Sequence, residues 1–211
     1  MGKAMALALA EHGSQVVVSS RKLDACEETA AEINAAVGAD RAIAVACNIG
    51  YKEQLQGLVD ETRSRLGAID TLIANAGVNP FYGPMSEIPD EAFDKTMNSN
   101  LRSNHWLCQM VAPDMLAKQR GSIMITASVG AFGPSETLGT YNISKMADIA
   151  LVRNLAMEWG PQGVRVNALC PGLIRTDFAK ALWDNPEAAQ RVTEQTPLRR
   201  FGEAVDFKGM A

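Results

Sequence analysis

The sequence has little of what several classes of protein require. Its 20 Lys and Arg residues are outnumbered by 24 Asp and Glu residues, which gives a net charge of −4. No run of basic residues interrupts this balance, so nucleic acid is a poor candidate partner. No apolar stretch approaches the length of a membrane span, and we therefore expect no membrane association.

Cysteine and histidine are also scarce, and both are scattered. The four cysteines show no C-x-x-C spacing and the two histidines stand far apart. Metal sites need grouped ligands, so we expect no metal site. Dispersed cysteines are typical of reduced, buried thiols, which predicts a cytoplasmic protein. These residues are Cys26, Cys47, Cys108, Cys170, His12 and His105.

What the sequence does contain is a repeated alternation of short apolar strands and helices. With 211 residues, 47% of them hydrophobic, the chain is expected to form one domain over residues 1–211. Strands are expected at 15–19, 42–47, 69–74, 122–127 and 164–169. Helices are expected at 3–12, 23–36, 51–66, 90–119, with a bend at Pro113, and 140–159. This order predicts an α/β fold, a doubly wound parallel sheet with helices on both faces.

Small or polar residues follow each of the five predicted strands. Parallel strands end at one edge of their sheet, and open α/β sheets bind ligands at that edge. We therefore expect one binding site built from the strand ends. The residues concerned are Ser20, Arg21, Asn48, Ile49, Asn75, Ala76, Gly77, Ser128, Pro171 and Gly172.

The stretch from Ser128 to Lys145 carries the strongest chemical signal. Tyr141 and Lys145 stand four residues apart, which places them on one helix face. A nearby ammonium lowers the pKa of a tyrosine, and such a tyrosine can exchange a proton with a substrate oxygen. Ser128, at a strand end, could hold a carbonyl oxygen in place. The alternative is a solvated helix face without catalytic function.

Four other positions have both a functional and a plain structural interpretation. Asn75-Ala76-Gly77 lets a flat ligand approach the backbone, or is an ordinary turn. Ser20 stands where an acidic residue would bind a ribose 2′-hydroxyl, and Arg21 follows it. This pair favours NADP over NAD, or Arg21 is a solvated cation. The segment 171–176 could present main-chain groups and the Thr176 hydroxyl to a carboxamide, or is a Pro-Gly turn. Asn100 could bond backbone or water, or lie on the surface.

Taken together, these residues resemble the short-chain dehydrogenase/reductase family over nearly the whole chain. The similarity rests on Asn75-Ala76-Gly77, Asn100, Ser128, Tyr141-x-x-x-Lys145 and Pro171-Gly172 in that order. The stretches VVVSSRK, NPFYGP, YNISK, PGLIRTDF and LRRFGE are also similar to NADP-dependent carbonyl and retinal reductases of peroxisomal type and their bacterial relatives.

The resemblance implies a Rossmann-like fold and a hydride-transfer oxidoreductase that uses NADP(H) with a carbonyl or secondary alcohol. Tyr141 would be the general acid in reduction and Lys145 would lower its pKa and bind the nicotinamide ribose. Ser128 would orient the carbonyl, and Asn100 would hold a water linking Lys145 to solvent.

The cofactor set that the resemblance implies joins Tyr141 and Lys145 to a series of strand-end residues. It comprises Gly2, Ser20, Arg21, Asn48, Ile49, Asn75, Ala76, Gly77, Pro171, Gly172, Ile174 and Thr176. Residues 176–196, with Phe178, Leu182 and Trp183, would form a lid over an apolar small-molecule substrate. Helices 90–119 and 140–159 would pack between the subunits of a homotetramer. A peroxisomal location would require a targeting tail after Ala211.

The chain also departs from the family pattern. Asn48 stands where many members have Asp, and both side chains can accept a hydrogen bond. Members open with a strand and a Gly-rich turn that binds a pyrophosphate, whereas Met1-Gly2 matches only the end of that turn. We therefore expect a sheet lacking the family's first strand, between strands 15–19 and 69–74, and its last strand.

Two alternatives remain open beside the reductase. The first is a truncated, non-catalytic homologue that acts by binding or oligomerising, which the incomplete pyrophosphate turn favours. The second is a 3-oxoacyl-thioester reductase, which would need a basic patch for its carrier. In the sequence only Arg199 and Arg200 near the lid offer one.

Overall fold

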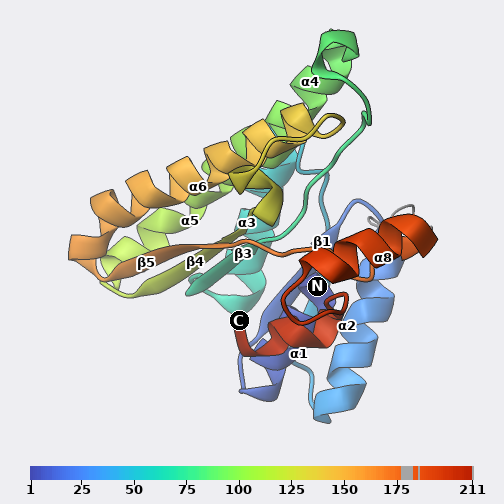
Figure 1. The fold of residues 1–211 in the computed structure, drawn as a ribbon. Helices are drawn as coiled ribbons and strands as arrows, with labels where there is room; N and C mark the ends of the chain where they lie inside the picture. Colours follow the sequence, from blue (N-terminus) through green and yellow to red (C-terminus); the bar gives the residue numbers. More distant parts are fainter. Residues whose placement is uncertain (177–182, 185, 211) are drawn as a thin grey trace.

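The computed structural model describes residues 1–176, 183–184 and 186–210. Strands and helices alternate through residue 169, as the sequence predicts (Figure 1). The strands are β1 Val16–Ser20, β2 Ala42–Ala46, β3 Thr71–Ala74, β4 Gly121–Thr126 and β5 Val164–Leu169. The α-helices are α1 Gly2–Glu11, α2 Leu23–Val37, α3 Lys52–Leu66, α4 Asp90–Met97, α5 Ser103–Ala117, α6 Gly139–Trp159 and α8 Pro186–Gln195. Short helical turns are η1 Met85–Glu87, η2 Asn98–Arg102, η3 Val129–Phe132, η4 Gly160–Gln162 and η6 Ala204–Met210.

The larger half of the molecule is built on the three-stranded parallel sheet β3-β4-β5, with β4 in the centre. Apolar side chains of α3, α5 and α6 pack against this sheet in one core, and α5 and α6 run along it side by side (Figure 1). Met115, Ile123 and Ile125 in this core have no exposed surface. Burial on this scale drives the pairing of helix and sheet.

The smaller half is the parallel pair β1-β2, packed with α1 and α2. A third cluster joins the two halves, because Met5 of α1 and Phe207 of η6 pack with Leu169 of β5 and Ile174. Helices therefore cover both faces of the strands, which confirms the predicted Rossmann-like arrangement.

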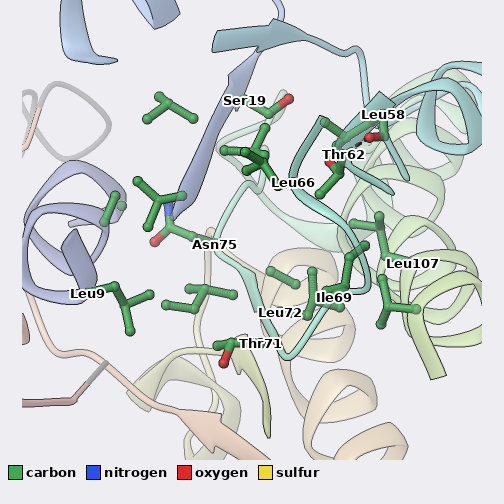
Figure 2. Close-up of a pocket in the computed structure, with 18 of the residues that line it drawn as sticks. Leu9, Ser19, Leu58, Thr62, Leu66, Ile69, Thr71, Leu72, Asn75 and Leu107 are labelled. Atoms are coloured by element: carbon green, nitrogen blue, oxygen red, sulfur yellow. Dashed lines mark hydrogen bonds between the residues drawn. The ribbon is translucent and has the colours of Figure 1, made fainter. Parts of the chain in front are cut away.

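A gap separates the two halves at the place where the sequence analysis expects a strand to be lacking. Within the described part of the chain, β1 pairs only with β2, and β3 only with β4. A cavity of about 820 Å³ lies between them, lined by residues of β1, β3 and α3 (Figure 2). Leu9, Leu66, Ile69 and Leu72 give its middle an apolar lining.

The predicted helix 90–119 is wrong in one respect. It is two α-helices, α4 and α5, separated by the π-helical turn η2 at Asn98–Arg102. The helix continues through Pro113, where the sequence placed the bend. A π turn widens the backbone by one residue, and such turns are frequent at functional sites. Asn100 lies at its centre and is completely buried.

Part of the predicted lid falls outside the described residues. Phe178 and Leu182 belong to that part, whereas the Trp183 indole Nε1 donates a hydrogen bond to the Thr176 carbonyl at 3.1 Å. Among the described helices none is long and apolar enough to cross a membrane. The same residues contain no cluster of His, Cys, Asp and Glu suited to a metal ion.

Candidate active site

Tyr141 and Lys145 lie in the first two turns of α6, over the end of β4. The Lys145 side chain is 3% exposed, and its Nζ donates to the carbonyl oxygen of Thr126, the last residue of β4, at 2.7 Å. Nζ lies 5.8 Å from the centre of the Tyr141 ring. Lys145 is therefore buried and Tyr141 half-buried, so their electrostatic interaction is stronger than on a solvated helix face.

Ser128 reaches the same place from the loop after β4. It caps the turn η3, and its Oγ accepts a hydrogen bond from the Gly130 amide at 3.1 Å. The Ser128 side chain also hydrogen-bonds the Tyr141 hydroxyl. The structure thus brings together the three residues to which the sequence analysis assigns the proton chemistry.

The expected lowering of the tyrosine pKa is wrong for this chain. Burial raises the pKa of Tyr141 above its ordinary value, and the negative charge of Asp148 raises it further, while the Ser128 hydrogen bond opposes both. Burial disfavours the charged phenolate. The Lys145 ammonium is paired with the Asp148 carboxylate, 3.1 Å away, which offsets its charge.

The side chain of Asn100 bonds protein groups in this structure, whereas the sequence analysis expects it to hold a water. Its Oδ1 accepts from the Val78 amide at 2.8 Å, and its Nδ2 donates to the Val78 carbonyl at 2.9 Å. Nδ2 also donates to Ser144 Oγ at 3.0 Å, which ties η2 to α6. The connection from Asn100 to Lys145 runs through two side chains that the sequence analysis did not single out.

Those two side chains are Asn104 and Asp148. Asn104 Nδ2 donates to the Asn100 carbonyl and to Asp148 Oδ1, the latter at 2.9 Å. Asp148 Oδ2 accepts from Lys145 Nζ at 3.1 Å. A sequence signal existed, since Asp148 lies three residues after Lys145 and Asn104 four after Asn100, spacings that share a helix face.

Five of the predicted cofactor residues line the large cavity, at the strand ends. Gly2, Ser20, Ile49, Asn75 and Ala76 all border it, and Asn75 projects from the end of β3 (Figure 2). A Cβ on Gly2 would lie 3.1 Å from Asn75 Nδ2, so the N-terminus of α1 approaches the β3 tip closely. An exposed helix N-terminus is favourable for a phosphate.

Gly77 follows Ala76 of the cavity lining and lies beside Asn100 and Lys145. A Cβ there would stand 3.5 Å from Lys145 Nζ and 3.4 Å from Asn100 Oδ1, so glycine keeps the space beside the ammonium open. A flat nicotinamide and its ribose fit such a position, so the residues present fit a dinucleotide.

The remaining predicted cofactor residues do not line the cavity. Arg21 is exposed just past β1, and Asn48 Oδ1 accepts from the Gly50 amide at 3.1 Å. The Pro171 carbonyl accepts from the Val129 amide at 3.0 Å, which places the 171–172 turn beside Ser128. The Ile174 side chain is 8% exposed and packs in the core, so only its backbone can face a ligand. Gly172 borders open space and Thr176 is half-buried.

A family model described as enoyl-(acyl carrier protein) reductase matches residues 1–211. Dehydrogenase/reductase SDR family member 4 of Oryctolagus cuniculus is 36% identical over 210 residues, which cover 100% of this chain and 80% of the relative. The human protein of the same name is 36% identical over 211 residues, covering 100% of this chain and 75% of the relative.

Solved structures agree with these relatives. Levodione reductase superposes with a TM-score of 0.94 at 26% identity, covering 99% of this chain and 83% of that one. A gluconate 5-dehydrogenase from Burkholderia cenocepacia, in complex with NADP and tartrate, has a TM-score of 0.91 at 26% identity, covering 98% and 80%. A short-chain type dehydrogenase/reductase from Mycobacterium marinum has a TM-score of 0.89 at 32% identity, covering 99% and 81%.

A doubly wound fold with Ser, Tyr and Lys gathered at the strand ends is that of an oxidoreductase working with a nucleotide cofactor. The chain belongs to the short-chain dehydrogenase/reductase family. It is accordingly a pyridine-nucleotide-dependent oxidoreductase of carbonyl and alcohol groups.

Proposed function

We propose that the protein is an NADP-preferring reductase of ketones, aldehydes or dicarbonyls. The observation that carries this proposal is the joint placement of Ser128, Tyr141 and Lys145 at the end of β4. Ser128 comes from a loop, and Tyr141 and Lys145 come from two turns of α6. Ser128 hydrogen-bonds Tyr141, and the Lys145 ammonium lies 5.8 Å from the centre of the Tyr141 ring. An assembly of this kind positions a carbonyl and supplies its proton.

The residues divide the chemistry between them. The Ser128 hydroxyl donates to the substrate carbonyl oxygen and holds it toward Tyr141. The protonated Tyr141 hydroxyl gives its proton to that oxygen in reduction and takes it back in oxidation. Lys145 lies next to the phenol ring and beside the open space at Gly77. The bound cofactor supplies or accepts the hydride.

The preference for NADP is supported by the end of β1. Arg21 is exposed there and follows Ser20, so no carboxylate stands at the position that would bind a ribose 2′-hydroxyl. A guanidinium binds a 2′-phosphate through paired hydrogen bonds. A lysine ammonium acts as a point charge and lacks this paired geometry. A similar solved structure, the Burkholderia cenocepacia gluconate 5-dehydrogenase, was determined with NADP.

The test is a fluorescence titration with NADPH and with NADH on three chains: the parent, Arg21→Ala and Lys22→Ala. Lys22 is a matched control because it is an exposed cation next to Arg21. We expect NADPH to bind the parent more tightly than NADH, and Arg21→Ala alone to lose that preference. Equal losses of NADPH affinity in Arg21→Ala and Lys22→Ala would overturn the assignment of the NADP preference to Arg21. No binding of either nucleotide would favour a non-catalytic homologue that acts by binding or oligomerising.

Reduction of a carrier-bound 3-oxoacyl thioester is the less favoured activity, although the matching family model carries an acyl-carrier name. It needs free basic charge for the carrier. Arg200 instead forms a two-pronged ion pair with Asp206, at 2.7 and 2.9 Å. Arg199, the other cation of the LRRFGE segment, forms no ion pair with the residues that the structure describes.

We also propose a homotetramer assembled through α5 and α6. Support comes from the large apolar side chains that α6 leaves exposed, namely Ile143 at 44%, Met146 at 43% and Met157 at 82%. A native mass near four times 22.6 kDa is the expected measurement. A cytoplasmic location is proposed as well, on the support of four free cysteine thiols.

A further inference from the structure

A buried carboxylate lies beside the catalytic lysine, and the proton chemistry described above makes no use of it. Asp148 has no exposed surface, and its two oxygens are both engaged. Oδ2 accepts from Lys145 Nζ at 3.1 Å, and Oδ1 accepts from Asn104 Nδ2 at 2.9 Å. A buried charge is costly unless it is paired and hydrogen-bonded, so this arrangement needs an explanation beyond packing.

The carboxylate is held from a second helix. Asn104 belongs to α5, and it also donates to the carbonyl of Asn100 in the π turn η2. Asn100 in turn donates to Ser144 Oγ, which donates to the Tyr141 carbonyl at 2.7 Å. The network therefore begins and ends on the α6 turn that carries the catalytic pair, and α5 fixes its middle.

We propose that Asp148 is a positioning residue of the reductase: clamped by Asn104, its carboxylate holds the Lys145 ammonium in place and offsets the charge that this ammonium presents to Tyr141. The proposal deepens the proposed function and rests on it. Among the described residues, Lys145 Nζ has two acceptors, the Thr126 carbonyl and Asp148, of which Asp148 carries the charge.

Few other buried titratable groups surround this cluster. The Cys108 thiol of α5 is fully buried, and burial together with the Asp148 charge raises its pKa to about 12. Burial also raises the pKa of the Cys170 thiol. A hydrogen bond with the Ser128 backbone and the charge of Lys145 oppose this rise. Other charged or titratable side chains on the elements packed against α6, and on α6 itself, are at least partly exposed: Asp90, Glu91, Asp94, Lys95, Arg102, His105, Asp114, Arg153, Glu158 and Arg165.

The consequence is a phenol kept in its protonated form. An unopposed ammonium would favour the phenolate of Tyr141, whereas the adjacent carboxylate favours the neutral phenol. This agrees with the raised pKa of Tyr141, to which burial contributes first and Asp148 next. Burial raises the pKa of Asp148, and the Lys145 charge together with the hydrogen bonds from Asn104 and Lys145 opposes that rise. A protonated phenol is the form that a reductase needs as proton donor.

The test is the titration of Tyr141 in the Asp148→Asn variant, which keeps the shape of the side chain and removes its charge. The chain has three tyrosines, so ¹³C labelling of the tyrosine ring carbon that bears oxygen gives three assignable NMR signals. Tyr51 and Tyr82 are 57% and 63% exposed and serve as internal references. We expect a downward shift of the Tyr141 pKa in Asp148→Asn, with both references unchanged.

The matched control is Asp114→Asn, which removes another carboxylate that bonds a cation and lies on α5. Asp114 pairs with Arg63 at 3.0 Å, away from the catalytic pair, so the Tyr141 titration should be the same as in the parent. Identical Tyr141 titrations in the parent and Asp148→Asn would overturn the proposal. This readout needs no turnover, so it decides the role of Asp148 even if the proposed activity fails.

A second pair of variants covers the case in which Asp148→Asn does not fold. Lys145→Met and Lys145→Met/Asp148→Asn differ only in the carboxylate, and the double variant leaves no unpaired buried charge. We expect Tyr141 to titrate at lower pH in the double variant than in Lys145→Met. Equal titration curves in these two chains would contradict the proposal in the same way.

Discussion

At the residue scale, the proposed role of Tyr141 as proton donor makes its protonation the expected determinant of the pH response. Burial and the Asp148 carboxylate raise the pKa of Tyr141, so the phenol stays protonated through the neutral range. In reduction this proton is donated, whereas oxidation needs the phenolate. The two directions should therefore depend on pH in opposite ways.

We predict that the rate of carbonyl reduction stays level through neutral pH, because the donor remains protonated until the pH approaches its raised pKa. The rate of alcohol oxidation should rise as the medium becomes alkaline. Steady-state pH profiles of kcat in both directions measure this. An alkaline fall of the reduction rate centred near neutral pH would show that Tyr141 ionises far below its ordinary value of 10.

The sequence predicted which residues gather at the end of β4, because their positions depend on local spacing. Tyr141 and Lys145 are neighbours on any helix, and Ser128 follows a strand. It did not predict the pKa direction of Tyr141, which depends on burial and on Asp148. The partner of Asp148 on α5, Asn104, lies 44 residues away, and that contact exists only in the folded chain.

At the element scale, the turn between α6 and β5 depends on one glycine. Gly163 has φ of +79°, and a Cβ on it would overlap the carbonyl oxygen of Gln119, just before β4. That contact lets the β5 entry pack against the β4 entry. Gly38, which ends α2 with φ of +66°, has nothing within 4 Å of the same position and is a matched control.

We predict that Gly163→Ala lowers the free energy of unfolding by about 3 kcal/mol or more, since a positive-φ alanine is strained and its methyl group overlaps backbone. Gly38→Ala should cost only the conformational part, about 1 kcal/mol. Urea unfolding followed by circular dichroism gives both values. Equal losses in the two variants would show that the close approach at Gly163 does not matter.

Element boundaries followed from apolar periodicity to within one or two residues, with one exception. The chain 90–119 reads as a single helix because its apolar residues continue through Pro113. Within the π turn at Asn98–Arg102, the side chain of Asn100 bonds the backbone of Val78 in another segment. A hydrogen bond between distant segments produces no periodic pattern in the sequence.

At the scale of the whole molecule, the two sheets and the cavity between them are the main feature. The order of strands and helices predicted the parallel fold, and the family pattern predicted where a strand is lacking. The facing edges of β1 and β3 carry backbone groups available to a further parallel strand. How far the two halves approach each other depends on the packing of Met5, Ile174 and Phe207, which no local pattern records.

The cavity and the buried Lys145 lie at the same edge of the molecule. The strand-end residues near the cavity and the buried pair in α6 meet at Gly77, where a missing side chain leaves room beside Lys145. In the proposed function, different elements of one sheet edge therefore supply nucleotide binding and proton transfer. A loss of proton transfer should therefore leave nucleotide binding in place.

The most direct test of the central claim is the turnover of Tyr141→Phe with NADPH and a panel of ketones, aldehydes and dicarbonyls. Removing the hydroxyl removes the proton donor and leaves the ring and the Lys145 contact. We predict that kcat falls by about a hundredfold or more, as loss of a general acid does, while NADPH binds as tightly as to the parent. Turnover within twofold of the parent, at equal NADPH affinity, would contradict the assignment of Tyr141 as the catalytic acid.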